Sequence, residues 1–343
     1  MKKSIGIKAI FLLVACCPFF TSNIFSQGTR LWATYYGGTG DEFCWSLATH
    51  RASGDVYLGG RTNSASSIAS GGFQNTYGGG GHDAFLVKFN SAGIRQWATY
   101  YGETGDDYCW GLATDPASGD VYMGGYTEST TGIASGGFQN TYGGGGDAFL
   151  VKFNSAGVRQ WATYYGGTAV DYCYRLATDP ASGDVYLGGR TNSASAIASG
   201  GFQNTISGVS DAFLVKFNSA GVRQWATYYG GTGVEWGYGV ATDASGNVYL
   251  AGYTQSTSGI ASGGFQNTYG GGSLDAFLVK FNSTGARQWA TYYGGMGSEY
   301  GSGVTTDALG NVYLVGLTAS TSAIAFGGFQ NTFGGGIYDA YLV

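Results

Sequence analysis

A tryptophan recurs along this chain at a nearly constant interval. The spacings are 65, 64, 64 and 64 residues, and each copy begins the sequence WATYYG, at Trp32, Trp97, Trp161, Trp225 and Trp289. A fixed long period is the signature of one supersecondary unit that has been copied several times. The fold must therefore be built from five closely similar units, which makes a single asymmetric catalytic site a weak expectation.

The composition favours ordered β-structure. Charged residues make up only 11% of the chain, aromatic residues make up 16%, and 64 of the 343 residues are glycine. Disordered chains combine high charge with few aromatic residues, so this chain is not expected to be disordered. Many short strands joined by glycine-rich turns have a composition of this kind.

One repeat contains four strand-like runs. In the second copy they cover residues 108–114, 121–126, 148–153 and 160–165, and they are rich in aromatic and branched residues. The segments DPASGD and NSAGVR are tight turns, whereas about 20 residues separate the second run from the third. Four antiparallel strands per repeat predict an all-β fold, a β-propeller with five four-stranded blades. A linear solenoid is the alternative, but it should have atypical capping repeats.

The two ends of the chain complement each other. Residues 31–36 correspond to a fourth strand alone, and the C-terminal part supplies three strands, at 303–306, 312–317 and 340–343. We expect these pieces to pair and close the ring, because closure removes free sheet edges. The abrupt stop at DAYLV is also compatible with a truncated gene, since the other copies continue as DAFLVKFN.

These motifs resemble a known family. The sequences DAFLVKFNSAGVRQWATYYGG and ATDASGNVYLAGYT are similar to the SBBP-type bacterial β-propeller repeat, which combines an Asp-Ala-Phe strand, a Thr-Tyr-Gly-Gly strand and a Gly-Asn-x-Tyr hairpin. The resemblance covers Leu31 to Val343. It implies a propeller in an exported bacterial protein, often a large surface protein, and it implies no particular ligand or reaction.

Residues 1–27 differ from the rest and predict a secretory signal peptide. Three lysines precede a twelve-residue apolar stretch, Ala9–Phe20, and a short polar segment follows it. The alternative is lipoprotein processing at Cys16, after Leu13-Val14-Ala15. Residues 28–343 would then form one secreted or cell-surface propeller domain. No other apolar run is long enough to span a membrane.

The charge of the mature chain argues against nucleic-acid binding. Removal of the three lysines of the signal leaves 13 basic and 21 acidic residues, a net charge of −8. A protein that neutralises phosphates would need a basic surface.

Three cysteines of the mature chain occupy one position of the repeat. Cys44, Cys109 and Cys173 correspond to Gly237 and Gly301 in the last two copies. Exchange of cysteine with glycine indicates a crowded site that needs a small residue. An odd number at equivalent positions disfavours a disulfide framework.

The long loops carry the sequence GGFQNT and are the first candidate ligand site. A ring beside two amides suits sugar binding, because CH groups stack on the ring and hydroxyl groups bond to the amides. The alternative is that the phenylalanine plugs the loop while the amides satisfy backbone groups. The residues are Phe73, Gln74, Asn75, Phe138, Gln139, Asn140, Phe202, Gln203, Asn204, Phe265, Gln266, Asn267, Phe329, Gln330 and Asn331.

An acidic residue directly before the first strand of each repeat is the second candidate. Five such carboxylates at a channel mouth could hold a cation through oxygen ligands. The alternative is that they accept backbone hydrogen bonds where the strand begins. The residues are Glu42, Asp107, Asp171, Glu235 and Glu299.

Catalytic motifs are weak in this sequence. The only histidines, His50 and His82, do not recur, and the carboxylates form equivalent sets rather than a distinct acid and base. We therefore expect a non-enzymatic binding or scaffold module without a cofactor, whose partner is an extracellular glycan or a surface protein. A glycan-active enzyme and a purely structural spacer are the alternatives. The sequence leaves the oligomeric state open.

Overall fold

The computed structural model describes residues 30–343, so the predicted signal peptide and Cys16 lie outside the described residues. Residues 34–343 form one compact unit built of strands, turns and loops. None of the described residues belongs to a helix long and apolar enough to cross a membrane.

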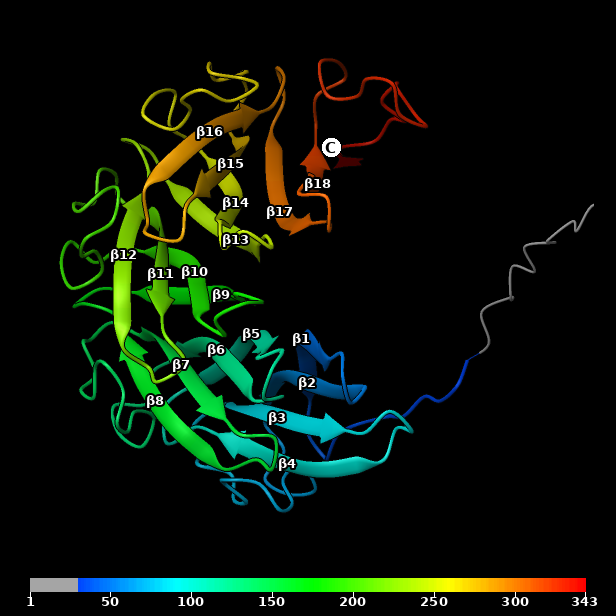
Figure 1. Ribbon diagram of the computed structural model, residues 1–343, viewed down its shortest axis with the longest axis vertical. Coiled ribbons are helices and arrows are strands. Elements are labelled where there is room, and N and C mark those ends of the chain that lie inside the picture. The colour runs from blue at the N-terminus through cyan, green and yellow to red at the C-terminus, as the bar shows by residue number, and fades with distance from the viewer. Residues whose placement is uncertain (1–29) are drawn as a thin grey trace, which may run out of the picture. The chain divides into compact units, whose positions relative to one another are not determined.

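Most of the strands form four-stranded antiparallel sheets, one for each repeat (Figure 1). This confirms the predicted all-β propeller-type fold. The sheets are β1 (Glu42–His50), β2 (Asp55–Thr62), β3 (Asp83–Phe89) and β4 (Arg95–Tyr101); β5 (Asp107–Thr114), β6 (Val121–Thr127), β7 (Asp147–Phe153) and β8 (Arg159–Tyr165); β9 (Asp171–Thr178), β10 (Val185–Thr191), β11 (Asp211–Phe217) and β12 (Arg223–Tyr229); and β13 (Glu235–Thr242), β14 (Val248–Thr254), β15 (Asp275–Phe281) and β16 (Arg287–Tyr293).

The fifth sheet differs from the expectation of four strands. It contains β17 (Glu299–Thr306), β18 (Val312–Thr318) and β19 (Asp339–Leu342) in that order. Residues 31–36 have no strand conformation, and no pairing of β19 with them is seen in the described residues. The predicted closure of the ring is therefore not observed.

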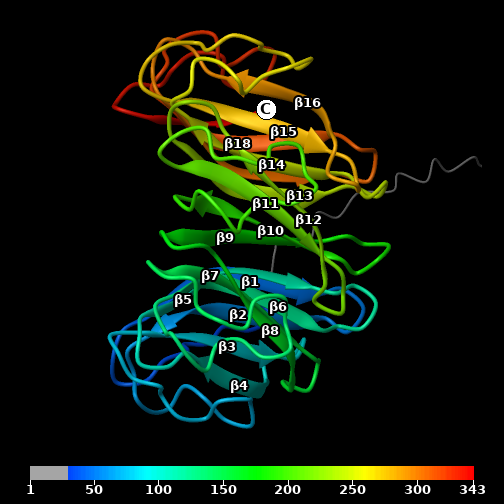
Figure 2. The same cartoon turned by 90° about the vertical axis from the view of Figure 1, so that its left-hand side faces the viewer.

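Consecutive sheets pack face to face, as Figure 2 shows from the side. The first strands β1, β5, β9, β13 and β17 lie beside one another in that order. We call the side of a sheet that meets the next sheet its forward face and the opposite side its rear face. Tyr57 and Trp97 on the forward face of the first sheet share one buried core with Cys109, Phe149 and Val151 on the rear face of the second. The core is thus a series of similar layers between sheets.

The long loops cover the outer edges of the sheets. In the first repeat, Ser70 exchanges two backbone hydrogen bonds of 2.9 Å with Ala98 of β4, and the N–H of Tyr100 donates to the carbonyl of Gln74. These hydrogen bonds join the loop to the outer strand of the sheet at Ala98 and Tyr100. The long loops therefore satisfy free backbone groups of the last strand, which would otherwise form an exposed edge.

The two ends of the series leave sheet faces uncovered. On the forward face of the fifth sheet, Val315 and Leu317 are each 44% exposed and Leu342 is 72% exposed. On the first sheet, Leu47 is 63% exposed, whereas its counterpart Leu112 is buried against the preceding sheet. In the described residues β1 and β17 do not pack together as the other consecutive first strands do.

Substitutions at the repeat position that holds Cys109 test the packing between sheets. A Cβ atom added to Gly59 would lie 2.8 Å from Cys109 Sγ and 3.1 Å from Leu112, so Cys109 fills a site without spare volume. We predict that Cys109→Leu lowers the unfolding free energy by about 1–3 kcal/mol through overpacking. Cys109→Gly should be tolerated, because Gly237 and Gly301 occupy the same position.

The matched control is Cys44→Leu, at the same position of the first repeat, where the cysteine is exposed. Urea denaturation of both leucine variants measures the difference. An equal effect of the two substitutions would contradict the packing argument.

Candidate functional site

The phenylalanines of the long loops lie at the junctions between sheets. The Phe138 ring lies 6.3 Å from the ring of Tyr165 in its own repeat and 6.3 Å from that of Phe217 in the next. The guanidinium group of Arg223 covers the Phe138 ring at 4.2 Å. Phe138 is 43% exposed, but Phe265, which precedes the incomplete sheet, is 84% exposed. The ring is thus half-buried by the following sheet.

The amide groups of the same loops are used within the fold. Gln139 Nε2 donates to the carbonyl of Thr141 and to Asp147 Oδ2, and its Oε1 accepts from the N–H of Gly166. Asn140 Nδ2 donates to the carbonyl of Gly137 at 2.9 Å. These contacts match the structural interpretation of the GGFQNT sequence. Ligand binding by the loops remains a prediction, and it would have to compete with these bonds.

The five acidic residues at the starts of the first strands do not come together. Glu235 accepts hydrogen bonds from the Gly231 N–H, from Thr254 Oγ1 and from Ser256 Oγ at 2.6–3.0 Å. Asp171 has equivalent donors in Gly167, Thr191 and Ser193. Each carboxylate therefore ties the link between two repeats to the end of a second strand. Within residues 30–343, no three acidic, histidine or cysteine side chains are placed to hold a metal ion.

A second carboxylate lies close to four of these five acids, all except Glu42. A Cβ atom added to Gly102 would be 2.6 Å from Asp107 Oδ2 and 2.9 Å from Asp83 Oδ1, so only glycine leaves room for both groups. Burial is the largest cause that raises the pKa of Asp83 to about 7 and that of Asp107 to about 7. Burial likewise raises the pKa of Asp147 to about 7, despite hydrogen-bond donors that favour the charged form.

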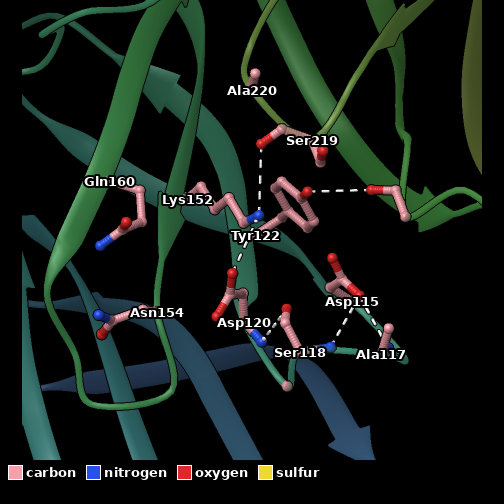
Figure 3. A network of polar contacts seen from close by, with 12 residues as sticks. Asp115, Ala117, Ser118, Asp120, Tyr122, Lys152, Asn154, Gln160, Ser219 and Ala220 are labelled. Atoms are coloured by element: carbon pink, nitrogen blue, oxygen red, sulfur yellow. Dashed lines mark hydrogen bonds and ion pairs between the residues drawn. The ribbon is translucent and has the colours of Figure 1, made fainter.

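Lysine and aspartate form a buried polar cluster at the hairpin turns, which the sequence analysis did not identify (Figure 3). Lys152 Nζ lies 3.1 Å from Asp120 Oδ2 and 3.4 Å from the carbonyl of Ser219 in the next repeat, and it lies over the Tyr122 ring. Trp161 Nε1 donates to the same Ser219 carbonyl at 3.1 Å. The same arrangement surrounds Lys88 and Lys216. Its recurrence and burial indicate a connection between sheets rather than a reaction centre.

A partly exposed row of aromatic side chains runs across the first strands of the sheets. In β5, Cys109 points into the core while the flanking Tyr108 and Trp110 remain partly exposed, as expected from strand alternation. We call the aromatic residues that flank this position in the five first strands the inner aromatic row. Its members are Phe43, Trp45, Tyr108, Trp110, Tyr172, Tyr174, Trp236, Tyr238 and Tyr300.

The rings of the inner aromatic row contact one another from sheet to sheet. The ring centroids of Trp45 and Trp110 are 6.2 Å apart, those of Trp110 and Tyr174 are 5.4 Å apart, and those of Tyr174 and Tyr238 are 4.8 Å apart. The row of ring contacts continues from Tyr238 through Tyr253 of β14 to Tyr300. The row is therefore a continuous surface. The aromatic residues on both sides of the small repeat position were the sequence signal for it.

Two arginines lie on this row without a carboxylate partner among the described residues. The Arg190 guanidinium carbon lies 3.9 Å from the ring centroid of Trp236 and 4.6 Å from that of Tyr172. Arg61 lies 4.7–5.2 Å from the rings of Phe43, Trp45 and Tyr108. Nε of both arginines has no hydrogen-bond partner in the described part of the chain. The positive charges are therefore stabilised mainly by ring faces.

Comparison with known proteins identifies the repeat. Residues 96–131, 160–195, 224–259 and 288–322 match the family model described as "Beta-propeller repeat", SBBP. The protein is an SBBP β-propeller repeat protein. The matched segments run from the fourth strand of one sheet through the first two strands of the next, which confirms the resemblance seen in the sequence.

Other similarities to this SBBP repeat protein are distant. A WD repeat-containing protein of Acanthamoeba polyphaga mimivirus, L264, is 24% identical over 302 residues, and the match covers 71% of the chain but only 21% of the viral protein. Hydrazine synthase of Kuenenia stuttgartiensis has a TM-score of 0.48 at 8% identity, with coverage of 93% of this chain and 65% of that chain. A Hadza microbial sialidase, Hz136, has a TM-score of 0.42 at 9% identity, with coverage of 79% and 52%.

The loop amides provide a test of their structural role. We predict that Gln139→Ala lowers the unfolding free energy by about 1–3 kcal/mol, because buried backbone groups lose their partners. Gln330→Ala is the matched control, since Gln330 in the incomplete fifth repeat is exposed and donates only to the Thr332 carbonyl. Chemical denaturation compares the two variants. A stable Gln139 variant with reduced glycan binding would favour the ligand-binding interpretation instead.

The buried carboxylates predict the pH dependence of stability. The pKa of Asp83, Asp107 and Asp147 is about 7 in the folded protein, above the value of about 3.9 for an unfolded aspartate. The folded state therefore holds more protons between these values, and stability falls as the pH rises from about 4 to about 7.

Thermal melting at several pH values tests this dependence. Asp147→Asn should flatten the decrease, whereas Asp41→Asn, which changes an exposed carboxylate, should not. A melting temperature that rises between about pH 4 and about pH 7 would contradict the assignment.

Proposed function

We propose that this protein is an exported, non-enzymatic binding module that holds a polysaccharide along the inner aromatic row. The observation that carries the proposal is the continuity of partly exposed rings across all five repeats, with Arg61 and Arg190 among them. Aromatic side chains with a few placed polar groups are the usual lining of a binding site for a partly apolar ligand such as a sugar.

The chemistry of the row favours a sugar chain that carries carboxylates. The CH groups of a sugar ring pack on Phe43 and Trp45, which are 45% and 38% exposed. Since neither arginine forms an ion pair with an acidic residue in residues 30–343, a ligand carboxylate can supply the missing negative charge. Repeated weak contacts along one chain would add up through multivalency.

The other repeated polar groups support binding rather than catalysis. A glycosidase needs one carboxyl group as acid and another as base or nucleophile on either side of the scissile bond. Here the repeated acids Asp171 and Glu235 point into their own repeats and accept hydrogen bonds from Ser, Thr and backbone groups. Export of the protein rests on the predicted signal peptide.

Titration with polygalacturonate and with neutral dextran tests the proposal through tryptophan fluorescence. We predict that polygalacturonate binds more tightly and that Arg190→Gln weakens binding about tenfold, since a hydrogen bond to a charged group contributes about 1.5 kcal/mol or more. Arg51→Gln, at an exposed turn, is the matched control. Equal binding by the Arg190 and Arg51 variants would contradict the site, and absence of binding to either polymer would favour a structural spacer.

A further inference from the structure

Beside the inner aromatic row, one position of the second strands alternates between arginine and tyrosine. It is the residue that pairs with the first aromatic residue of each sheet, and in the first four sheets it is Arg61, Tyr126, Arg190 and Tyr253. The Tyr126 ring stacks on that of Tyr172 at 4.6 Å, and Arg190 lies over the same Tyr172 ring. A positive charge therefore recurs after two sheets, with an aromatic ring between the two arginines.

Two carboxylates lie on the second sheet, between the sheets that carry these arginines. The Tyr108 hydroxyl donates to Asp106 Oδ2 at 2.8 Å, and the Tyr126 hydroxyl donates to Glu128 Oε1 at 2.8 Å. The rings of the two tyrosines stack at 6.0 Å, and the N–H of Glu128 donates to the Asp106 carbonyl at 2.9 Å. Glu128 is exposed and the Asp106 side chain is 32% exposed. Both acids are thus held at the edge of the inner aromatic row, where a ligand can reach them.

This acidic pair occurs in one sheet and is not needed to pack the repeat. The backbone hydrogen bond that joins Glu128 to Asp106 recurs in every sheet and identifies the equivalent residues. They are Asp41 and Asn63 in the first sheet, Val170 and Asn192 in the third, Val234 and Gln255 in the fourth, and Ser298 and Ala319 in the fifth. Since valine, serine and amides serve equally well there, the two acids of the second sheet need another explanation.

The spacing of the sheets matches alternate sugars of one polysaccharide chain. The inner aromatic row advances by 6.2 Å from Trp45 to Trp110 and by 5.4 Å from Trp110 to Tyr174, one sheet at a time. Two such steps separate the first sheet from the third, a span comparable to two linked sugar rings. Groups bound at Arg61 and at Arg190 would therefore belong to every second sugar.

We propose that the inner aromatic row selects a polysaccharide in which acidic sugars alternate with uncharged ones. This inference rests on the proposed function and narrows its ligand class. Carboxylates of alternate sugars bind at Arg61 and Arg190, while the sugar between them lies beside Asp106 and Glu128, which accept hydrogen bonds from its hydroxyl or amide groups. A chain with a carboxylate on every sugar would place one against these acids, and like charges in contact oppose binding.

Two other basic groups near the acidic pair determine the conditions of the test. His82 Nδ1 lies 3.8 Å from Asp106 Oδ1, so a protonated His82 would offset the negative charge of the pair. Arg175 donates from Nη1 to the Trp110 carbonyl at 2.8 Å. In the register of β9 and β10 it pairs with Gly188, so it lies outside the alternation of Arg61, Tyr126 and Arg190.

Titration of the full chain with hyaluronan and with polygalacturonate fragments of equal length tests the proposal. Hyaluronan carries a carboxylate on every second sugar, whereas polygalacturonate carries one on every sugar. At about pH 8, where an ordinary histidine is neutral, tryptophan fluorescence should show that hyaluronan binds at least about tenfold more tightly. Equal or tighter binding of polygalacturonate overturns this proposal and leaves the proposed function standing. Absence of binding by both polymers overturns both.

Glu128→Gln identifies the cause of the preference. The amide oxygen can still accept the hydrogen bond of Tyr126, so the substitution removes the charge and keeps the contact. We expect about fivefold tighter binding of polygalacturonate and little change for hyaluronan, and the added substitution Asp106→Asn should remove most of the remaining preference. Glu103→Gln is the matched control, because the Glu103 carboxylate lies beside Gly132 of the long loop. An unchanged preference in the Glu128 variant, or the same gain in the Glu103 variant, overturns the proposal.

Discussion

The packing of one sheet on the next is the interaction on which the rest of this structure depends. On the forward face of a sheet, the second strand has a glycine or alanine at the contact. On the rear face of the following sheet, the first strand has a cysteine or glycine there. Because these residues are small, the two surfaces approach closely. The close approach of Gly59 and Cys109 illustrates how little volume remains. Because packed interiors tolerate neither voids nor excess volume, this contact needs small residues. Gly188, for example, faces Val240 and Leu250 of the next sheet.

The same packing explains why most of the repeated polar residues are structural. Junctions between sheets need buried backbone groups to be satisfied, and Gln139, Asp171 and Lys152 serve this purpose at equivalent places. Under the proposed function, side chains outside the junctions serve in binding. They are the inner aromatic row, with Arg61 and Arg190.

The sequence predicts the architecture well because the signals are local and repeated. Alternation of aromatic and small residues, together with the turn sequences, places the four strands of the second repeat to within one residue; residues 108–114, for instance, were predicted where β5 covers Asp107–Thr114. The prediction was poorer at the two ends, because β17 begins at Glu299 rather than at residue 303 and residues 31–36 form no strand. The course of the long loop along β4 was not predicted, since it depends on contacts between Gln74 and Tyr100 that have no local signature. The sequence analysis also proposed the loop amides as ligand groups, because residue type alone does not reveal that Gln139 is already bonded. Closure of the ring was predicted from the complementary ends of the chain, but the described residues show no pairing of β19 with residues 31–36.

Hydrogen exchange followed by mass spectrometry tests most directly whether contacts between sheets hold the molecule together. Local opening is easiest where a sheet lacks a neighbour. In dilute solution, the amides of β18 and β19 should exchange much faster than those of β10 and β11, which have a sheet on both sides. Equal protection of β19 and β11 in dilute monomer would contradict the account.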